Sequence, residues 1–516
     1  MSELDQGILI VDFGSQTTLL IARRLREMGV YTEVWPCTDG RLTNPPSSIG
    51  IILSGGPSSV ADIDSPRLAK ALIETGKPVL GICYGMQLLV EHFGGRVAPG
   101  HVREFGRTPL IRQDGVESQL LADLPESSVV WMSHSDAVAE APENIVITAR
   151  SDAGSVAAVE FAGHPICAVQ FHPEVTHTEY GEQVLKRFAF EMCGADGQWS
   201  ASDMVQTSIQ SIQAQVGPEG RVICGLSGGV DSSVAAALIA RAIGKRLTCI
   251  LVDTGLMRHG EVDTVSRLFR EEFEVELRVV DASERFLTAL AGETDPETKR
   301  KIIGKLFIDV FEQEARSIDG VTHLAQGTLY PDVIESESVR GPSAVIKSHH
   351  NVGGLPDILP FALLEPLRML FKDEVRDLGD ALGLPHTLTG RHPFPGPGLA
   401  IRILGEITPE RVSILRQADR IFIQALRDEN HYDAVWQAFA VLLPVKTVGV
   451  MGDARTYESV VALRAVTSRD GMTADRADLP MAFLGAVGNR IINEVVGVNR
   501  VVYDVTSKPP GTIEWE

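Results

Sequence analysis

A cysteine between two glycines is the first position in this sequence that could do covalent chemistry. Residues 81–87 read G-I-C-Y-G-M-Q and follow an apolar run that is typical of a strand. We expect a helix over residues 86–93, so Cys83 would lie on a tight strand-to-helix turn at a helix N-terminus. The positive end of the helix dipole favours the thiolate there, and the thiolate is the nucleophilic form of cysteine.

A histidine and a glutamate, two residues apart, provide a matching base. Residues 171–174 read F-H-P-E at the end of another apolar run. Residues two apart in extended backbone project to the same side, so His172 would take and return a proton while Glu174 orients its ring. A single cysteine is more often a small buried residue. The turn glycines, the strand-to-helix context and the His-Pro-Glu together favour a catalytic Cys83.

These motifs resemble the class I glutamine amidotransferases, in which G-x-C-x-G-x-Q is followed much later by H-P-E. The resemblance covers the first predicted domain, residues 1–196. It implies that glutamine is the substrate, that a glutamyl thioester forms on Cys83, and that Gln87 helps to fix the substrate. Residues 54–57, S-G-G-P, match the family's oxyanion loop. The backbone N–H groups of Gly56 and Tyr84 are therefore expected to face the developing negative charge.

A glycine-rich turn is the second candidate site. Residues 227–233 read S-G-G-V-D-S-S between an expected strand at 221–225 and an apolar helix at 233–243. Such a turn lets backbone amides and hydroxyls surround a phosphate, but no lysine follows as in a Walker A loop. A bare Ser-Gly-Gly is more often an ordinary turn. The complete segment resembles the PP-loop of N-type ATP pyrophosphatases, which implies ATP binding by Ser227, Gly228, Gly229, Val230, Asp231, Ser232 and Ser233.

Further segments extend the resemblance to essentially the whole chain, which is similar to the glutamine-hydrolysing GMP synthetase family. They are residues 252–258, 299–304, 325–332, 347–351, 393–399 and 507–516. This resemblance implies that XMP is adenylylated by ATP on its 2-oxygen and then aminated by ammonia released from glutamine. It also assigns Arg300, Lys508 and Glu514 to XMP binding and Lys372 to a lid over the nucleotides. Lys372 and the basic cluster at 299–301 could instead be solvated helix surface.

ATP chemistry implies Mg²⁺, and Asp231 is the nearest carboxylate that could support the metal or its waters. The alternative role for Asp231 is an N-terminal helix cap.

The alternation of short β-branched runs with amphipathic stretches indicates an α/β protein. We expect two successive α/β domains with mainly parallel sheets, at 1–196 and 197–395, followed by a smaller α+β dimerisation and XMP-binding domain at 396–516. Expected strands are 8–13, 49–53, 78–82, 156–161, 166–171, 248–253 and 276–280. Expected helices are 16–28, 65–75, 178–192, 296–315 and 409–428.

The charge and the hydrophobic pattern of the sequence limit the kinds of partner that the protein can bind. The 516 residues carry 47 Lys and Arg against 68 Asp and Glu, a net charge of −21, which disfavours binding to nucleic acid. No long apolar run or basic leader is present, so we expect a cytoplasmic protein without a membrane partner. The resemblance implies a homodimer.

Several rival functions share part of this pattern. NAD synthetase and tRNA-thiolating enzymes share the PP-loop, although the latter usually bring extra cysteines and basic surfaces. Asparagine synthetase uses a processed N-terminal cysteine, whereas residue 2 here is Ser2. A catalytically inactive amidotransferase that acts as a binding module is disfavoured by the intact Cys83, His172 and Glu174.

Overall fold

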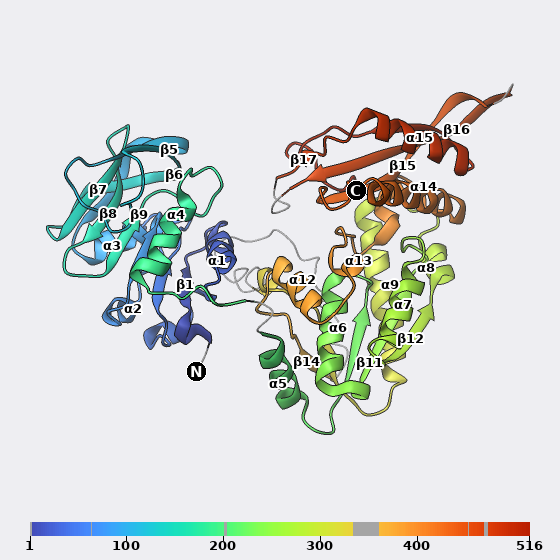
Figure 1. Ribbon diagram of the computed structural model, residues 1–516, viewed down its shortest axis with the longest axis horizontal. Coiled ribbons are helices and arrows are strands. Elements are labelled where there is room, and N and C mark those ends of the chain that lie inside the picture. Colours follow the sequence, from blue (N-terminus) through green and yellow to red (C-terminus); the bar gives the residue numbers. More distant parts are fainter. Residues whose placement is uncertain (1–2, 63, 201–203, 334–360, 452–453, 469–472) are drawn as a thin grey trace. The chain divides into compact units, whose positions relative to one another are not determined.

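The computed structural model describes residues 3–62, 64–200, 204–333, 361–451, 454–468 and 473–516 (Figure 1). The described residues form two compact units. Unit 1 lies within Met1–Asp203 and Pro331–Ser348, and unit 2 within Met204–Tyr330 and His349–Glu516. The segment 347–351, which contributes to the family resemblance, falls outside the described residues.

Unit 1 is built on a nine-stranded sheet with the order β2-β1-β3-β4-β9-β8-β7-β5-β6. The first five strands in this order, β2, β1, β3, β4 and β9, pair in parallel. The pairs between β9, β8, β7, β5 and β6 are antiparallel. The strands are β1 (Ile8–Asp12), β2 (Thr32–Pro36), β3 (Gly50–Leu53), β4 (Val79–Ile82), β5 (Arg96–Arg112), β6 (Ser127–Glu140), β7 (Ile145–Ser151), β8 (Val156–Phe161) and β9 (Ile166–Val169). The central parallel strands β1, β3 and β4 are buried along their whole length, as their continuous apolar runs require.

The helices of unit 1 connect and flank these strands. They are α1 (Thr18–Glu27), α2 (Lys70–Glu74), α3 (Tyr84–His92) and α4 (Gly181–Lys186), with short helices η1 (Glu3–Gln6), η2 (Gly40–Thr43) and η3 (Arg187–Met192). The helix expected at 65–75 is shorter than predicted. The helix expected at 178–192 is α4 followed by the wider, π-type turns of η3.

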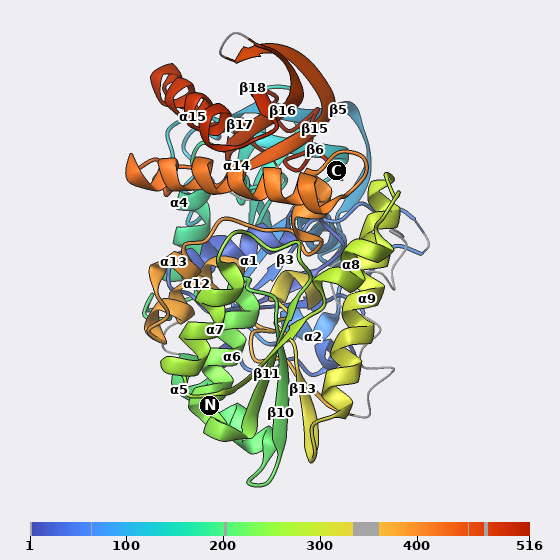
Figure 2. The same ribbon diagram turned by 90° about the vertical axis from the view of Figure 1, so that its right-hand side faces the viewer.

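Unit 2 contains a five-stranded parallel sheet with the order β12-β11-β10-β13-β14. The sheet lies between α6 and α7 on one side and α9 on the other (Figure 2). The strands are β10 (Arg221–Leu226), β11 (Leu247–Asp253), β12 (Glu276–Asp281), β13 (Val321–Ala325) and β14 (Ala362–Leu364). The helices are α5 (Met204–Val216), α6 (Val230–Ile243), η5 (Gly244–Arg246), α7 (Glu261–Glu271), α8 (Ser283–Ala289), α9 (Pro296–Arg316), α12 (Lys372–Ala381), α13 (His386–Thr389) and η6 (Gly398–Arg402).

The last part of unit 2 is a second, mainly antiparallel sheet with two long helices. Strands β15 (Gln437–Met451) and β16 (Ala454–Thr467) form an antiparallel ribbon, and β18 (Val498–Tyr503) joins β16 in parallel. The remaining elements are β17 (Asp475–Arg476), α14 (Pro409–Asp428) and α15 (Met481–Glu494).

One hydrophobic core runs through both parts of unit 2. It includes Ile223 of β10, Phe311 of α9, Phe422 of α14 and Leu463 of β16, each at most 1% exposed. The two α/β domains and the smaller α+β part agree with the expected fold class. The predicted domain boundaries at 196/197 and 395/396 stay predictions.

Candidate active sites

The turn that carries Cys83 lies between β4 and α3. Cys83 is the residue before the helix and has φ 52° and ψ −104°, a conformation that is unusual for a residue with a side chain. A Cβ on Gly81 would lie 2.7 Å from Leu89 Cδ1, and one on Gly85 would overlap the carbonyl oxygen of Leu53. Both positions therefore require glycine, and the prediction that Cys83 occupies a tight strand-to-helix turn is confirmed.

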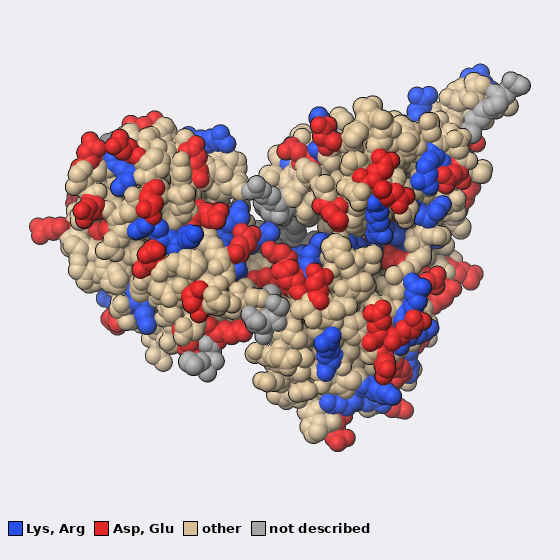
Figure 3. Space-filling view, in the orientation of Figure 1, with Lys and Arg blue, Asp and Glu red and all other residues tan. Residues whose placement is uncertain are grey.

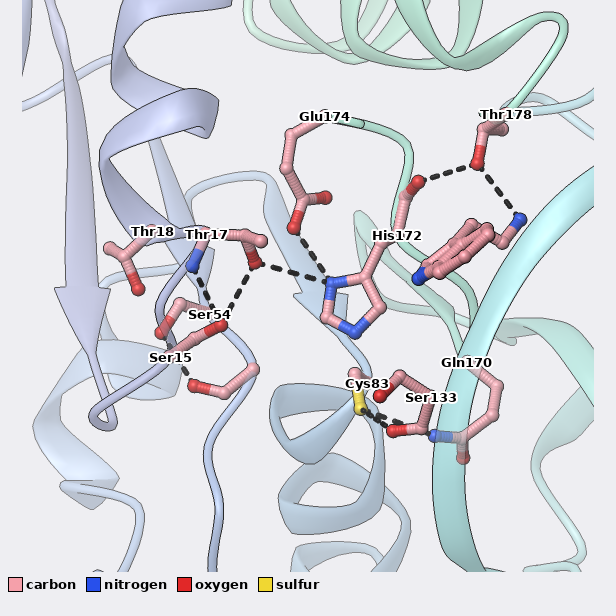
Figure 4. A network of polar contacts seen from close by, with 12 residues as sticks. Ser15, Thr17, Thr18, Ser54, Cys83, Ser133, Gln170, His172, Glu174 and Thr178 are labelled. Atoms are coloured by element: carbon pink, nitrogen blue, oxygen red, sulfur yellow. Dashed lines mark hydrogen bonds and ion pairs between the residues drawn. The ribbon is translucent and has the colours of Figure 1, made fainter. Parts of the chain in front are cut away.

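His172 and Glu174 lie beside this cysteine, in the segment that follows β9 (Figure 4). The Nδ1 atom of His172 is 2.7 Å from Glu174 Oε1, and both side chains are buried. The carboxylate fixes the proton on Nδ1, so the other ring nitrogen faces Cys83. The structure therefore brings the three predicted catalytic residues together.

The charge of His172 follows from these neighbours. Burial by itself would lower the pKa of His172, but the Glu174 carboxylate and the Cys83 sulfur outweigh it and raise that pKa to about 10. The ring is therefore an imidazolium at neutral pH. A cation beside the sulfur stabilises a thiolate, which is the arrangement that nucleophilic catalysis by cysteine requires.

The other cysteines differ from Cys83 in their surroundings. Burial raises the pKa of each of their thiols, namely Cys37, Cys167, Cys193, Cys224 and Cys249. These thiols are therefore poor nucleophiles at neutral pH.

The predicted oxyanion donors Gly56 and Tyr84 lie in the loop after β3 and at the start of α3. A Cβ on Gly56 would lie 2.7 Å from the carbonyl oxygen of Phe13, so only glycine fits this loop. Within the part of the chain that the structure describes, no group accepts a hydrogen bond from the backbone N–H of Gly56 or Tyr84. Both N–H groups are thus available to a ligand.

Gln87 is buried behind the nucleophile rather than free in a cavity. Its Nε2 lies 3.3 Å from the backbone oxygen of Asp136 and 3.4 Å from Oε1 of Gln170. Sequence reasoning missed Gln170, although it precedes His172 by two residues, the same spacing that pointed to Glu174. It also missed the carbonyl oxygen of Ser133, which lies 3.9 Å from the Cys83 sulfur.

A second buried histidine–carboxylate pair lies in the β5–β6 part of unit 1. His134 Nε2 is 3.2 Å from Glu104 Oε2, and both side chains are almost fully buried. Burial lowers the pKa of His134. No local pattern predicts this pair, because Glu104 lies in β5 and His134 in β6.

The PP-loop lies between β10 and α6 in unit 2. Gly228 has φ 73°, and a Cβ there would lie 2.5 Å from Glu261 Oε1. The hydroxyl of Ser227 is 3.1 Å from that of Ser232, and it accepts a hydrogen bond from the backbone N–H of Gly229. These residues form a compact polar turn at the helix N-terminus.

Two predicted ATP-binding residues point elsewhere. The helix begins at Val230, three residues earlier than predicted, because Gly229 is its N-cap. Val230 is buried, and Ser233 is fully buried with no hydrogen-bond partner for its hydroxyl among the described residues. Any contact that these two make with ATP would therefore come from their backbone.

Asp231 is paired with the predicted lid residue. Both of its carboxylate oxygens lie 2.6 Å from Lys372 Nζ at the start of α12. The alternative role of Asp231 as a helix cap is wrong, since Gly229 is the N-cap and no side chain caps this helix. Lys372 is not an isolated surface residue but contacts the PP-loop directly.

The described residues include no cluster of three or more His, Cys, Asp or Glu side chains that could hold a metal. One carboxylate at a phosphate-binding turn still suits Mg²⁺, which commonly takes one or two protein carboxylates together with substrate phosphates and water. Asp231 fits that description, because its side chain is partly exposed at the loop.

Each of the residues assigned to XMP lies in the last segment of the chain or contacts it. Arg300 Nη2 donates to the backbone oxygen of Glu516, and the neighbouring buried Lys299 is 2.7 Å from the Glu516 carboxylate. Glu514 accepts two hydrogen bonds from the fully buried Arg402. The backbone of Lys508 pairs with Ala474 in both directions.

Arginines connect this region to the PP-loop. Arg258, Arg391 and Arg402 each place a guanidinium within 5.4 Å of the centre of the Phe394 ring. Arg391 also donates to the backbone oxygen of Gly228 in the PP-loop. The proline-rich segment around Phe394, which contributed to the resemblance, thus lies against the predicted ATP site.

Comparison with known proteins gives three family matches in the order of the predicted domains. They are Glutamine amidotransferase class-I over residues 9–192, NAD synthase over 202–302 and GMP synthase C terminal domain over 424–515. The curated GMP synthase [glutamine-hydrolyzing] of Phenylobacterium zucineum is 57% identical over 99% of both chains. That of Solidesulfovibrio magneticus is 56% identical over the full length of both.

The chain belongs to the glutamine-hydrolysing GMP synthase family. A solved glutamine amidotransferase from Thermotoga maritima also matches 36% of this chain and 97% of its own, with 17% identity and a TM-score of 0.31. Across the described part of this GMP synthase family member, no helix is both long and apolar enough to cross a membrane.

Proposed function

We propose that this chain makes GMP from XMP, ATP and glutamine. The observation that carries the proposal is the presence in one chain of a Cys83–His172–Glu174 site and a PP-loop, together with the full-length similarity to GMP synthases. Glutamine hydrolysis in unit 1 would supply the ammonia, and ATP in unit 2 would activate XMP.

In unit 1, the Cys83 thiolate attacks the side-chain carboxamide carbon of glutamine. The backbone N–H groups of Gly56 and Tyr84 stabilise the oxyanion, and the His172 imidazolium gives its proton to the departing ammonia. The neutral ring then accepts a proton from the water that hydrolyses the thioester. Glu174 holds the ring in position through both steps.

In unit 2, the 2-oxygen of XMP attacks the α-phosphorus of ATP and pyrophosphate leaves. Ammonia then attacks the C2 carbon that carries the adenylylated oxygen and displaces AMP with that oxygen, which gives GMP. Ser227, Gly228, Gly229 and Ser232 would hold the phosphates. Mg²⁺, when bound with ATP, would neutralise phosphate charge, with Asp231 as its protein carboxylate and Lys372 released toward the phosphates.

For XMP we propose contacts to Arg300, Lys508 and Glu514. Arg300 and Glu514 already have partners in Glu516 and Arg402, so XMP would share or replace those contacts. A lysine and an arginine suit a nucleotide phosphate, and a carboxylate suits base or ribose donors. We expect the protein to work in the cytoplasm, where its nucleotide substrates are found.

We also propose a homodimer through the β15–β16 ribbon. Figure 1 shows the joined ends of these strands projecting from the rest of unit 2. Val448 pairs with Tyr457 across the ribbon, and Val450 lies two residues further on the same face. These three side chains are 44%, 65% and 76% exposed, which is unusual for a row of apolar residues unless a partner covers them.

The test compares nitrogen donors in the wild-type chain and in Cys83→Ala. We expect GMP formation from XMP and ATP with either glutamine or ammonium in the wild type. The variant should lose the glutamine-dependent reaction and keep the ammonium-dependent one, because unit 2 is unchanged. Loss of both reactions in a folded variant would contradict the division of labour.

NAD synthetase is the alternative to exclude, since the NAD synthase family matches residues 202–302. Nicotinic acid adenine dinucleotide in place of XMP is the matched substrate control. We expect no amination of that dinucleotide. Activity with it and none with XMP would overturn the proposed function.

A further inference from the structure

Gln170 lies against the nucleophile and has no part in the mechanism above. It follows β9 directly, is 1% exposed, and its backbone N–H bonds to the carbonyl oxygen of Ala157. Its Nε2 lies 3.6 Å from the Cys83 sulfur (Figure 4). This is within hydrogen-bonding distance for a sulfur acceptor.

The orientation of the Gln170 amide is fixed by its neighbours. The backbone oxygen of Asp136 can only accept a hydrogen bond, so the Gln87 side chain must present its NH₂ group there. The same NH₂ group faces Gln170, which must therefore present its carbonyl oxygen to Gln87. The NH₂ group of Gln170 is left to face the sulfur.

A second polar group near the sulfur has a different character. The backbone oxygen of Ser133, 3.9 Å away, can accept a hydrogen bond from a thiol but repels a thiolate. The donor from Gln170 does the reverse, because it stabilises a thiolate and gains little from a thiol. The two groups therefore discriminate between the protonation states of Cys83.

We propose that Gln170 is a positioning residue that donates a hydrogen bond to the Cys83 thiolate, with its amide held in the donating orientation by Gln87. This role rests on the proposed glutamine hydrolysis in unit 1. The charged groups around the sulfur are His172 and Glu174, with the His134–Glu104 pair beyond Ser133. Gln170 adds an uncharged donor to this set.

The test measures how fast iodoacetamide alkylates Cys83 between pH 5 and 10 in the full-length protein. Peptide mass spectrometry separates Cys83 from the other cysteines. Gln170→Met keeps the length of the side chain and removes the donor. Gln170→Glu keeps the shape and replaces the donor with a carboxylate oxygen. Gln183→Glu, on the exposed side of α4, is the matched control for the added charge.

A hydrogen bond to a charged group corresponds to a change of about 10- to 100-fold in the ratio of thiolate to thiol. We therefore expect the alkylation profile of Gln170→Met to move to higher pH by about one to two pH units, and that of Gln170→Glu to move further. Gln183→Glu should match the wild type. A merely structural role would change the melting temperature but would not move the pH profile.

Wild-type profiles in both Gln170 variants would overturn the proposal. If one variant fails to fold, the other decides, and Gln87→Met provides an independent test. That change leaves the sulfur contact in place but frees the Gln170 amide to rotate, so it should move the alkylation profile to higher pH as well. Failure of the wild type to hydrolyse glutamine would contradict the proposed function instead, since alkylation of Cys83 does not depend on it.

Discussion

At the scale of single residues, the glutaminase site works through one unusual charge. His172 is buried, and burial normally favours a neutral ring, yet Glu174 and Cys83 keep it protonated. In the proposed mechanism the imidazolium serves first as the counterion of the thiolate and then as the acid for the leaving ammonia. The carboxylate of Glu174 therefore acts on the reaction through the histidine.

Replacing Glu174 by glutamine should lower the pKa of His172. The raised pKa, about 10, keeps the acid form available through neutral and mildly alkaline pH, so its loss moves the alkaline limb of the activity profile to lower pH. We expect kcat for glutamine hydrolysis at pH 8 to fall about 10- to 100-fold. The measurement is kcat against pH from 6 to 10.

The control for this variant is Glu182→Gln on the exposed side of α4. It makes the same chemical change without touching the histidine. An unshifted alkaline limb in Glu174→Gln would show that the carboxylate does not set the charge of His172.

At the scale of elements, the turn between β4 and α3 depends on close backbone contact. Gly85 packs so tightly against Leu53 of β3 that a side chain would have to displace the strand. Gly85→Ala should therefore lower the free energy of unfolding by about 2–4 kcal/mol and abolish glutamine hydrolysis. Chemical denaturation monitored by circular dichroism gives the first value.

Gly40→Ala is the matched control, since Gly40 is exposed and a Cβ there meets nothing within 4 Å. Its effect should stay within about 0.5 kcal/mol. Equal stability of the two variants would mean that the strand accommodates the extra methyl group.

Local signals in the sequence predicted many of the helices, strands and turns. The glycines at the two turns mark both sites, and the helix expected at 409–428 is α14, which starts at Pro409 with Thr408 as its N-cap. Contacts between distant residues were not predictable. Gln170 and the Glu104–His134 pair depend on which strands become neighbours, and no short window of sequence contains that information.

The last segment of the chain also depends on contacts between residues that are distant in the sequence. Arg464 of β16, fully buried, donates to the backbone oxygens of Thr506, Thr512 and Ile513 and pairs with Asp504. The family resemblance assigns Lys508 and Glu514 of this segment to XMP binding. The structure shows in addition that the segment is bound to the core of unit 2.

Arg464→Met should therefore destabilise unit 2 by about 3–5 kcal/mol, because the partly buried Asp504 carboxylate loses its cation and several carbonyl oxygens lose their donor. Arg490→Met on α15 removes only an exposed pair with Glu494 and should stay within about 0.5 kcal/mol. The measurement is the melting temperature of each variant compared with that of the wild type. Similar melting temperatures would show that the segment contributes little to stability.

At the scale of the whole molecule, each proposed chemical step belongs to one unit. All the residues placed at the glutaminase site lie in unit 1, and those of the PP-loop lie in unit 2. Unit 2 also carries the exposed ribbon that we assign to the dimer. A variant that breaks the dimer should therefore leave glutamine hydrolysis by unit 1 intact.

The variant for this test is Val450→Lys with Tyr457→Lys. Two cations on the apolar face of the ribbon should prevent association, so light scattering should report the mass of one 55.8 kDa chain instead of two. Val279→Lys, at a partly exposed site on β12, is the control and should stay dimeric. A wild-type mass of one chain would exclude the proposed dimer.

The contrast among the six cysteines has a practical outcome for anyone who handles this enzyme. Burial holds five thiols in their unreactive form, and the sixth lies beside the His172 imidazolium. A limiting dose of a mild electrophile should thus label one site per chain and count functional glutaminase centres rather than total protein. For the same reason, oxidation during purification should modify Cys83 first, so glutamine hydrolysis should be lost before the ammonium-dependent reaction.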